Sequence, residues 1–154
     1  MYKVLFVCHG NICRSPMAEF ILRDMLKKRG TQGVEVASAA TSTEEIGNGV
    51  HRGTREVLHR LGIDCSFKRA RQMTRADYRE YDLLLGADSR NILNMQRIAG
   101  GDPDGKIMRL LDFTERPRDI SDPWYTGDFD TTYADVKEGC EALIAALCSR
   151  GVIV

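Results

Sequence analysis

Three residues near the N-terminus have the types and spacing for chemistry on a phosphorylated ligand. Cys8 ends an apolar run at residues 4–8, Arg14 follows six positions later, and Ser15 and Pro16 come directly after it. A cysteine thiolate is a strong nucleophile, and the planar guanidinium of arginine matches the oxygens of a phosphate group. Each residue alone has an ordinary role, as a buried thiol or a solvated charge. The deciding point is whether the fold brings them to one site.

The segment between Cys8 and Arg14 is predicted to be a tight loop that enters a helix. Gly10 permits positive φ and close backbone approach, and Asn11 tolerates the left-handed region better than most residues. With Ser15 as the helix N-cap, unpaired N–H groups and the positive end of the helix dipole favour an anion in this loop. We expect the same environment to favour the thiolate form of Cys8. The Ser15 hydroxyl is placed to donate a hydrogen bond to the sulfur.

Composition and charge narrow the class of protein. The 154 residues are 43% hydrophobic and 29% charged, which is ordinary for one soluble globular domain, so we predict a single domain over residues 1–154. Basic and acidic residues both number 22, so no overall field attracts nucleic acid or an anionic membrane. No apolar stretch approaches the roughly 20 residues of a membrane span, and the N-terminus does not resemble a signal peptide. We therefore expect a cytoplasmic protein with no nucleic-acid partner and no membrane insertion.

The five cysteines are odd in number and irregularly spaced, which argues against a secreted disulfide framework. Cys8 and Cys13 have a spacing that zinc accepts, but no second pair of ligands accompanies them. We therefore predict no metal site. We expect Cys65, Cys140 and Cys148 to be structural.

Apolar runs alternate with helical periodicity along the chain. We predict strands at residues 2–8, 34–40, 82–87 and 106–113. We predict helices at residues 15–29, 51–61, 74–81, 89–99 and 131–149. This alternation, with short continuous apolar strands, is typical of an α/β protein with a parallel sheet covered on both faces. The loop at 114–130 is long for a compact domain, and such loops are often functional.

The motif Cys8-His-Gly-Asn-Ile-Cys-Arg14-Ser15-Pro16 resembles the active loop of low-molecular-weight protein tyrosine phosphatases. A bare Cys-x5-Arg recurs by chance, but the intervening residues are also in place, and the match continues in "SAATSTEEIGN" (38–48), "ARQMT" (70–74) and "SDPWY" (121–125). The resemblance covers almost the whole length. It implies a phosphate-binding loop composed of Cys8, His9, Gly10, Asn11, Ile12, Cys13, Arg14 and Ser15. For the fold we predict a three-layer α/β/α domain with a four-stranded parallel sheet in the flavodoxin-like order 2-1-3-4.

The resemblance also implies the reaction and its acid. The substrates would be phosphotyrosine-containing proteins and small aryl phosphates, with inorganic phosphate as product and competitive ligand and with no cofactor. Asp122, stiffened by Pro123, matches the general acid of the family, although Asp-Pro is also a common turn opener. Cys8 would attack phosphorus while Asp122 protonates the leaving oxygen, and water would then hydrolyse the phosphocysteine with Asp122 as base. The competing carboxylates of the same loop are Asp119, Asp128 and Asp130.

Further roles follow from the same resemblance. Asn11 would hydrogen-bond with Ser15 and Ser38 and so support the loop. The family often has a histidine in this network, where this chain has Lys68. Cys13 would form a reversible disulfide with Cys8, and the alternative is a packed thiol.

The outer residues of the site bear on the substrate. Trp124 and Tyr125 would form an aromatic wall for a phosphotyrosine ring, or would instead pack the loop. Many relatives carry an aromatic residue where this chain has Glu44, so we expect weaker stacking there and a bias against acidic peptides. We place His9 at the rim. The other two histidines, His51 and His59, are predicted to be solvated on a surface helix.

Three alternatives remain open. Arsenate reductases of this architecture need extra cysteines near residues 75–95, and this chain has none there. Phosphoarginine phosphatases of the family typically carry threonine where this chain has Ile12, which suits a phenyl ester better. A non-catalytic phosphoanion-binding module or thiol redox sensor would have no need for both Cys8 and Asp122.

Overall fold

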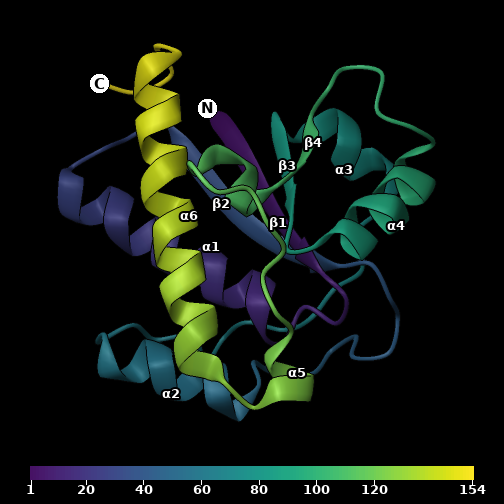
Figure 1. The fold of residues 1–154 in the computed structure, drawn as a ribbon. Helices are drawn as coiled ribbons and strands as arrows, with labels where there is room; N and C mark the ends of the chain where they lie inside the picture. Colours follow the sequence, from purple (N-terminus) through teal and green to yellow (C-terminus); the bar gives the residue numbers. More distant parts are fainter.

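A computed structural model describes all 154 residues. Its centre is a four-stranded parallel sheet in the order β2-β1-β3-β4 (Figure 1). The strands are β1 (Tyr2–Cys8), β2 (Val34–Ala40), β3 (Leu83–Gly86) and β4 (Ile107–Arg109). β1 pairs with β2 on one side and with β3 on the other, so it is a central strand. The predicted parallel sheet and its order are confirmed.

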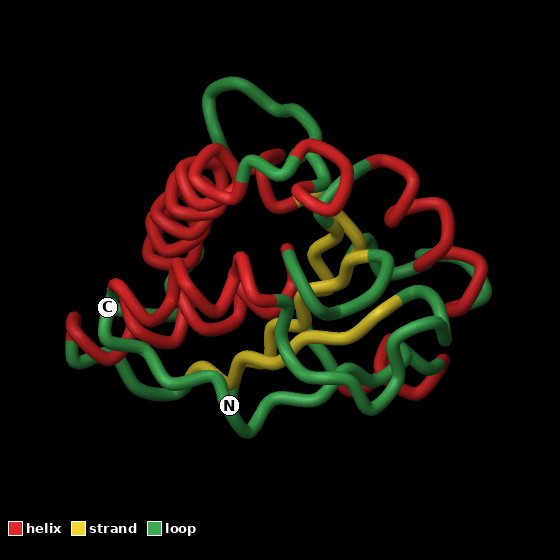
Figure 2. The backbone as a smooth tube through the Cα atoms, turned by 90° about the horizontal axis from the view of Figure 1, so that it is seen from below, coloured by secondary structure: helices red, strands yellow, loops and turns green.

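Helices cover both faces of the sheet, which gives the predicted three layers. One face is covered by α1 (Arg14–Arg29), α2 (Arg52–Arg60) and α6 (Phe129–Ser149), and the other by α3 (Arg75–Glu80) and α4 (Ser89–Ala99). Figure 2 shows the strands in yellow between these two groups of helices. No helix is both long enough and apolar enough to cross a membrane.

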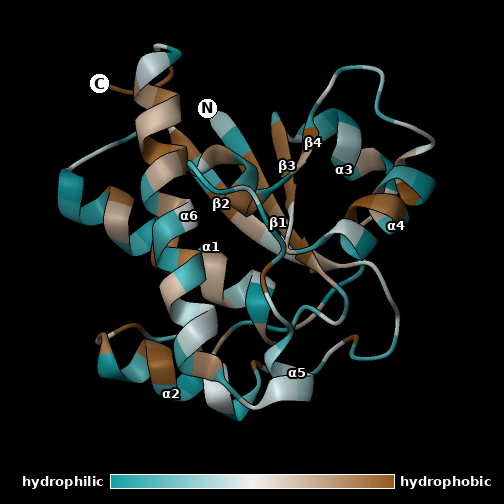
Figure 3. Cartoon of the chain, viewed as in Figure 1, coloured by the Kyte–Doolittle hydropathy of each residue, from teal (hydrophilic) through white to brown (hydrophobic).

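The alternation of side chains along β1 builds two cores. Val4 and Phe6 pack in the larger core with α1 and α6, whereas Leu5 and Val7 pack in the smaller core with α3 and α4. Figure 3 shows the hydrophobic colouring concentrated on the strands. Because side chains alternate, Cys8 falls on the α1 face, at the carboxyl end of a central strand. This is the edge at which open parallel sheets bind ligands.

The predicted fourth strand, residues 106–113, is wrong in its second half. β4 ends at Arg109, and Leu110–Phe113 form a 3₁₀ turn, η1. The carboxylate of Asp112 accepts a hydrogen bond from the Arg109 backbone N–H at 2.8 Å and stabilises that turn. Leu110 and Leu111 are fully buried, so an apolar pair in a short turn has the sequence pattern of a strand.

The ends of the helices differ from the prediction near the site. α1 begins at Arg14 with Cys13 as N-cap, so Ser15 lies inside the helix and does not cap it. The predicted loop at 114–130 contains a short helix, α5 (Pro123–Thr126), and α6 begins at Phe129 after the N-cap Asp128. The other predicted helices and strands are confirmed to within two residues at each end.

Candidate active site

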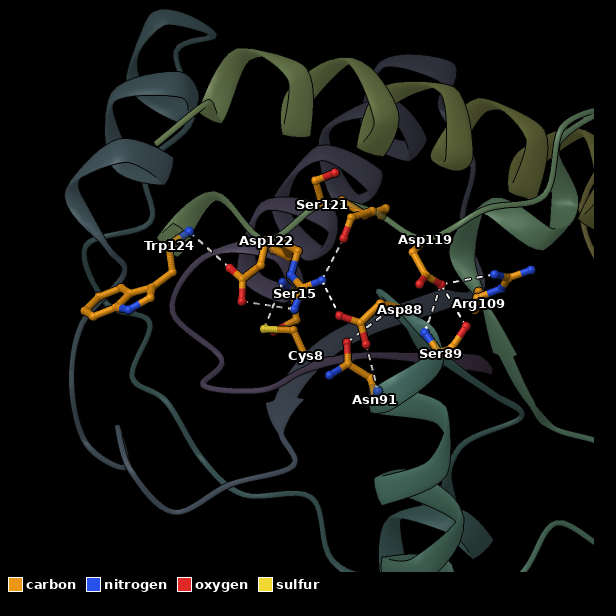
Figure 4. Close-up of polar contacts among 12 residues, drawn as sticks. Cys8, Ser15, Asp88, Ser89, Asn91, Arg109, Asp119, Ser121, Asp122 and Trp124 are labelled. Carbon is orange, nitrogen blue, oxygen red and sulfur yellow. Dashed lines mark hydrogen bonds and ion pairs between the residues drawn. The ribbon is translucent and has the colours of Figure 1, made fainter. Parts of the chain in front are cut away.

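The loop from Cys8 to Ser15 brings the sulfur of Cys8 against the first turn of α1. The Cys8 Sγ lies 3.0 Å from the Ser15 Oγ, and the Ser15 backbone N–H donates to the same sulfur at 3.4 Å (Figure 4). The Ser15 hydroxyl also lies 3.4 Å from the Ala39 carbonyl, which is the longer contact. Two donors can therefore stabilise negative charge on this sulfur, although Ser15 is not the helix cap.

The backbone of the loop is fixed through its carbonyl groups. The carbonyls of Cys8 and His9 accept from the N–H groups of residues 41 and 42, and that of Ile12 accepts from the N–H of His51. The Cys13 carbonyl accepts from the Thr54 hydroxyl at 2.9 Å. By contrast, no acceptor in the protein pairs with the backbone N–H groups of residues 9–13. The carbonyl groups of the loop are thus fixed by hydrogen bonds, while its N–H groups remain available to bind an anion.

Asn11 is the structural centre of the loop. It is the only non-glycine residue with positive φ, at 58°, a conformation that asparagine tolerates. Its amide donates to the Ser15 Oγ at 2.8 Å and to the Ser38 Oγ at 2.9 Å, and its carbonyl oxygen accepts from the Arg71 N–H at 3.2 Å. Because Asn11 already donates to the Ser15 oxygen, the Ser15 hydrogen is directed elsewhere, and the sulfur of Cys8 is its nearest acceptor.

Two charged side chains complete this network. The Ser38 hydroxyl donates to the buried carboxylate of Glu19 at 2.5 Å, and Lys68 donates to the Ser38 carbonyl at 2.9 Å. Lys68 lies 3.8 Å from Glu19. Burial lowers the pKa of the Lys68 amine, and the nearby Glu19 charge acts against that decrease. Lys68 therefore joins this network through the Ser38 carbonyl and the Glu19 charge.

The Arg14 guanidinium is buried beneath the loop, and three groups from other segments hold it. One nitrogen donates to the Asp88 carboxylate and to the Ile120 carbonyl, both at 2.7 Å, and the other lies 3.4 Å from the Asp122 carboxylate. Burial opposes the charge, but the Cys8 sulfur, Asp88 and Asp122 outweigh it, so the pKa of Arg14 is raised. A permanent cation is thus fixed beside the nucleophile.

Asp122 lies at the N-terminus of α5 and faces the site. One carboxylate oxygen accepts from the Trp124 backbone N–H at 3.1 Å, and the other is the one near Arg14. The competing carboxylates are engaged elsewhere: Asp119 with Ser89 and Arg109, Asp128 as the cap of α6, and Asp130 with Arg60. Of these four aspartates, only Asp122 lines the cavity that contains Cys8.

That cavity has a volume of about 300 Å³ and collects most of the predicted site residues. Its lining consists of Cys8, His9, Gly10, Ile12, Cys13, Arg14, Glu44, Glu45, Asp122, Trp124 and Tyr125. At the rim, the ring of His9 lies 2.9 Å from the carboxylate of Glu44. Glu45 extends the acidic side of the rim and was not predicted. Asn11, Ser15 and Ser38 lie behind the lining, as supporting residues should.

The remaining cysteines and histidines divide in a simple way. All five cysteines are free thiols, and Cys13 is buried next to Cys8 in the loop. Burial, with a contribution from the charge on Cys8, raises the pKa of Cys13 to about 12.

His59 is exposed as predicted, but the prediction for His51 was wrong. His51 is half-buried as the N-cap of α2, stacks on Phe129 at 5.1 Å and meets the Trp124 ring edge-on at 5.6 Å. Trp124 therefore packs the loop and lines the cavity at once.

A larger groove, of about 1030 Å³, lies between α2 and the segment at residues 127–130. It is more open than the cavity at Cys8 and contains none of the predicted site residues. An ion pair between Arg60 and Asp130 joins its two sides at 2.9 Å. The predicted site residues lie in the smaller cavity, which combines a thiol, a buried guanidinium and a carboxyl group.

Besides Glu45 at the rim, sequence reasoning missed two supporting residues of the site, Asp88 and Glu19. Both contact predicted residues directly, Asp88 through Arg14 and Glu19 through Ser38. Signals for both exist in the sequence. Asp88 follows the apolar strand at residues 83–86, so it also lies at the ligand-binding edge of the sheet. Glu19 is an acidic residue on the otherwise buried face of α1, one turn after Ser15.

Comparisons with known proteins agree with this geometry. Residues 3–151 match the family described as low molecular weight phosphotyrosine protein phosphatase. The chain is 43% identical over 150 residues to the low molecular weight protein-tyrosine-phosphatase YfkJ of Bacillus subtilis, covering 96% of each chain. The crystal structure of YfkJ superposes with a TM-score of 0.93 at 42% identity, covering 97% of this chain and 96% of that one.

Two more distant structures share the architecture. The low molecular weight protein tyrosine phosphatase of Streptococcus pyogenes matches with a TM-score of 0.84 at 38% identity, covering 96% of this chain and 93% of that one. A drosophila arginine phosphatase matches with a TM-score of 0.86 at 30% identity, covering 94% of this chain and 96% of that one. Fold and site together define a phosphatase of the cysteine-nucleophile class. The chain belongs to the low molecular weight phosphotyrosine protein phosphatase family.

Proposed function

We propose that this protein hydrolyses phosphotyrosine in proteins, and small aryl phosphates, through a phosphocysteine formed on Cys8. The observation that carries the proposal is the shared cavity: Cys8, the Arg14 guanidinium and the Asp122 carboxyl line the same space, and the last two lie 3.4 Å apart. A nucleophile, a fixed cation and a proton donor are the groups that a phosphoryl transfer through an enzyme cysteine requires.

In the first step the Cys8 thiolate attacks phosphorus in line with the leaving oxygen. The S–P bond forms, the P–O bond breaks, and Asp122 gives its proton to the departing oxygen. Arg14 and the unpaired loop N–H groups hold the three equatorial oxygens, whose charge persists throughout the transfer. Ser15 stabilises the sulfur as a thiolate before the attack and as the leaving group afterwards.

In the second step water attacks the phosphocysteine. Asp122, now ionised, accepts a proton from that water, the S–P bond breaks, and inorganic phosphate leaves while Cys8 returns to the thiolate. The carboxylate therefore changes role between the steps. The same contacts that hold the transferred group bind free phosphate, so inorganic phosphate should be a competitive inhibitor.

The test of this function compares the parent protein with two variants on p-nitrophenyl phosphate and on a phosphotyrosine peptide. Cys8→Ser should be inactive, and Asp122→Ala should lose about 10²–10⁴-fold in kcat/KM, the usual contribution of general acid catalysis. Acid quenching of the turning-over parent should trap a phosphate group on Cys8. A parent as inert as Cys8→Ser would contradict the proposal and leave only phosphoanion binding.

The choice of substrate rests on the residue at position 12. Ile12 lines the cavity with an apolar side chain, which favours a phenyl ester over the guanidinium of phosphoarginine. The similarity to an arginine phosphatase makes the direct comparison necessary. We expect a higher kcat/KM for a phosphotyrosine peptide than for a matched phosphoarginine peptide. The reverse order would show that phosphoarginine is the preferred substrate.

We also propose that Cys8 and Cys13 form a reversible disulfide. We place the protein in the cytoplasm, where thiols are normally kept reduced, so the disulfide would form only under oxidation. Hydrogen peroxide would oxidise the Cys8 thiolate to a sulfenate with release of water or hydroxide. Cys13 would then attack that sulfur and form the S–S bond with loss of a second water. Burial raises the pKa of Cys13 to about 12, so this thiol is protonated at neutral pH. We therefore expect peroxide to react with Cys8 before it reacts with Cys13. Dithiothreitol should restore activity in the parent, whereas in Cys13→Ser a second peroxide should oxidise the unprotected sulfenate to the sulfinate, with loss of water, and dithiothreitol does not reduce a sulfinate.

A further inference from the structure

The carboxylate of Asp119 lies three residues before Asp122 and ties this stretch to two other parts of the fold. Its Oδ1 accepts from the Ser89 N–H and the Ser89 hydroxyl, both at 2.9 Å, and from the Arg109 guanidinium at 3.0 Å (Figure 4). Burial acts to raise the pKa of Asp119, but hydrogen bonds from Arg109 and Ser89 outweigh it and hold that pKa below its usual value. These hydrogen bonds therefore favour the ionised form of Asp119.

Its partner Ser89 is the neighbour of Asp88, the residue that holds Arg14. Figure 4 shows Asp88 and Ser89 side by side at the start of α4. Asp88 itself cannot shift freely, because its Oδ1 accepts from the Asn91 N–H at 2.8 Å and its own N–H donates to the Asn91 side chain at 3.2 Å. Two consecutive residues on one rigid helix end thus position the phosphate-binding guanidinium and the segment that carries the general acid.

The segment between Asp119 and Asp122 is short and partly fixed. Ile120 is buried, donates its N–H to the Ala87 carbonyl at 2.9 Å and accepts from Arg14 at its own carbonyl. Beyond Asp122, Pro123 is buried but residues 124–128 are exposed, with Trp124 at 57%. The carboxyl group of Asp122 therefore lies close to the boundary between an anchored, buried stretch and an exposed one.

We propose that Asp119 is a positioning residue that aims Asp122 at the leaving oxygen, which rests on the proposed role of Asp122 as general acid. Proton transfer needs the carboxyl group within hydrogen-bond reach of the oxygen it protonates. Loss of the Asp119 anchor leaves Cys8, the loop and Arg14 in place but lets Asp122 occupy more positions. The loss should therefore matter most where the leaving group needs a proton most.

The experiment measures kcat/KM for a series of aryl phosphates whose leaving phenols differ in acidity. In Asp119→Ala, kcat/KM should fall by about 10-fold for phenyl phosphate but by about 2-fold for p-nitrophenyl phosphate, because a small misplacement of a catalytic group is enough to slow proton transfer. Asp119→Asn keeps an acceptor oxygen for Ser89 and should recover most of the activity. The inhibition constant of inorganic phosphate should stay at the parent value in both variants.

Asp112→Ala is the matched control. Asp112 binds the same Arg109 guanidinium, at 2.8 Å, but makes no hydrogen bond or ion pair with residues 119–122, so its loss should lower kcat/KM equally for all leaving groups or not at all. If Asp119→Ala behaved in that uniform way, the carboxylate would be only structural and the proposal wrong. If instead Asp122→Ala kept the parent's dependence on the leaving group, Asp122 would not be the acid, and the role of Asp119 would fall with it.

Discussion

The phosphate-binding loop and the rim of the cavity are built in opposite ways. In the loop, Asn11 and Arg14 are 1% and 3% exposed, and each makes three polar contacts, at least two of them with other segments. At the rim, Tyr125 is 84% exposed and the Glu44 side chain 68%, and the only partner of Glu44 across the cavity is His9. The residues of the loop, where we propose the chemistry, are fixed by buried contacts, whereas the rim residues, which we propose meet the rest of the substrate, are exposed and make few contacts.

This contrast separates two kinds of substitution. Changes in the loop should alter kcat and, where a buried network is broken, the free energy of unfolding. Changes at the rim should alter KM and leave both of those quantities near the parent values. Each of the following experiments tests whether loop and rim substitutions differ in this way.

The largest effect is expected from Cys8→Ser, which removes the nucleophile and little else. We expect a loss of at least about 10⁴-fold in kcat, in line with removal of catalytic nucleophiles elsewhere, with an unfolding midpoint close to that of the parent. Hydrolysis of p-nitrophenyl phosphate and urea unfolding measure the two quantities. Cys148→Ser, at a half-buried position outside the cavity, is the control and should match the parent in both.

The next effect is expected from Asn11, where chemistry and stability should fall together. Asn11→Ala removes three hydrogen bonds and places alanine at a φ of 58°, so we expect about 3 kcal/mol lower unfolding free energy and at least about 10-fold lower kcat. Asn11→Gly loses the same bonds without the strain and should be the more stable of the two. Equal stability of both variants and the parent would show that the loop does not depend on this residue.

A smaller effect, confined to KM, is expected from the rim. Glu44→Trp introduces the aromatic residue that many relatives carry, and aromatic contacts contribute about 0.5–1.5 kcal/mol, so KM for aryl phosphates should fall about 2–10-fold. Glu44→Gln separates loss of charge from gain of a ring: it should bind acidic phosphopeptides better than the parent without improving p-nitrophenyl phosphate. An unchanged KM in Glu44→Trp would place the substrate ring elsewhere.

The smallest effect on activity at neutral pH is expected from the protonated thiol of Cys13. With its pKa raised from 9.0 to about 12, the folded protein retains this proton longer than the unfolded chain does. The Cys13 contribution to stability is therefore constant below about pH 9 and is lost progressively as pH rises toward 12. Cys13→Ala should keep its activity at pH 7 and show a shallower loss of stability above pH 9 than the parent, measured by urea unfolding across that range. Equal slopes in the two proteins would refute this assignment.

The helices and strands that the sequence predicts well are those whose bounds are set by residues close together in the chain. β2 was predicted at its observed bounds from its apolar pattern, and α4 was predicted at its observed bounds from apolar spacing and the glycine stop at Gly100. The second half of β4 failed because Leu110 and Leu111 are buried by tertiary packing against α6, in a turn that no apolar pattern distinguishes from a strand. The close approach of η1 to α6 depends on Gly139 of α6, where a Cβ would lie 2.5 Å from the Leu110 side chain.

The site divides in the same manner. Cys8, Arg14 and Asp122 belong to short motifs with fixed spacing, so they could be predicted without a structure. Asp88 contacts Arg14 across 74 positions of sequence, and only the order of the strands brings the two together. His51 was misjudged because its surroundings, the rings of Phe129 and Trp124, come from segments that the sequence does not show to be neighbours.

The position of β1 between two other strands has a consequence for how this enzyme fails. A strand with ladders on both sides belongs to the part of a protein whose amide protons exchange last, since both neighbours must separate before its backbone opens. Cys8 is the final residue of that strand, so no partial opening of the periphery displaces it. Displacement of Cys8 by heat or denaturant should then coincide with global unfolding instead of preceding it.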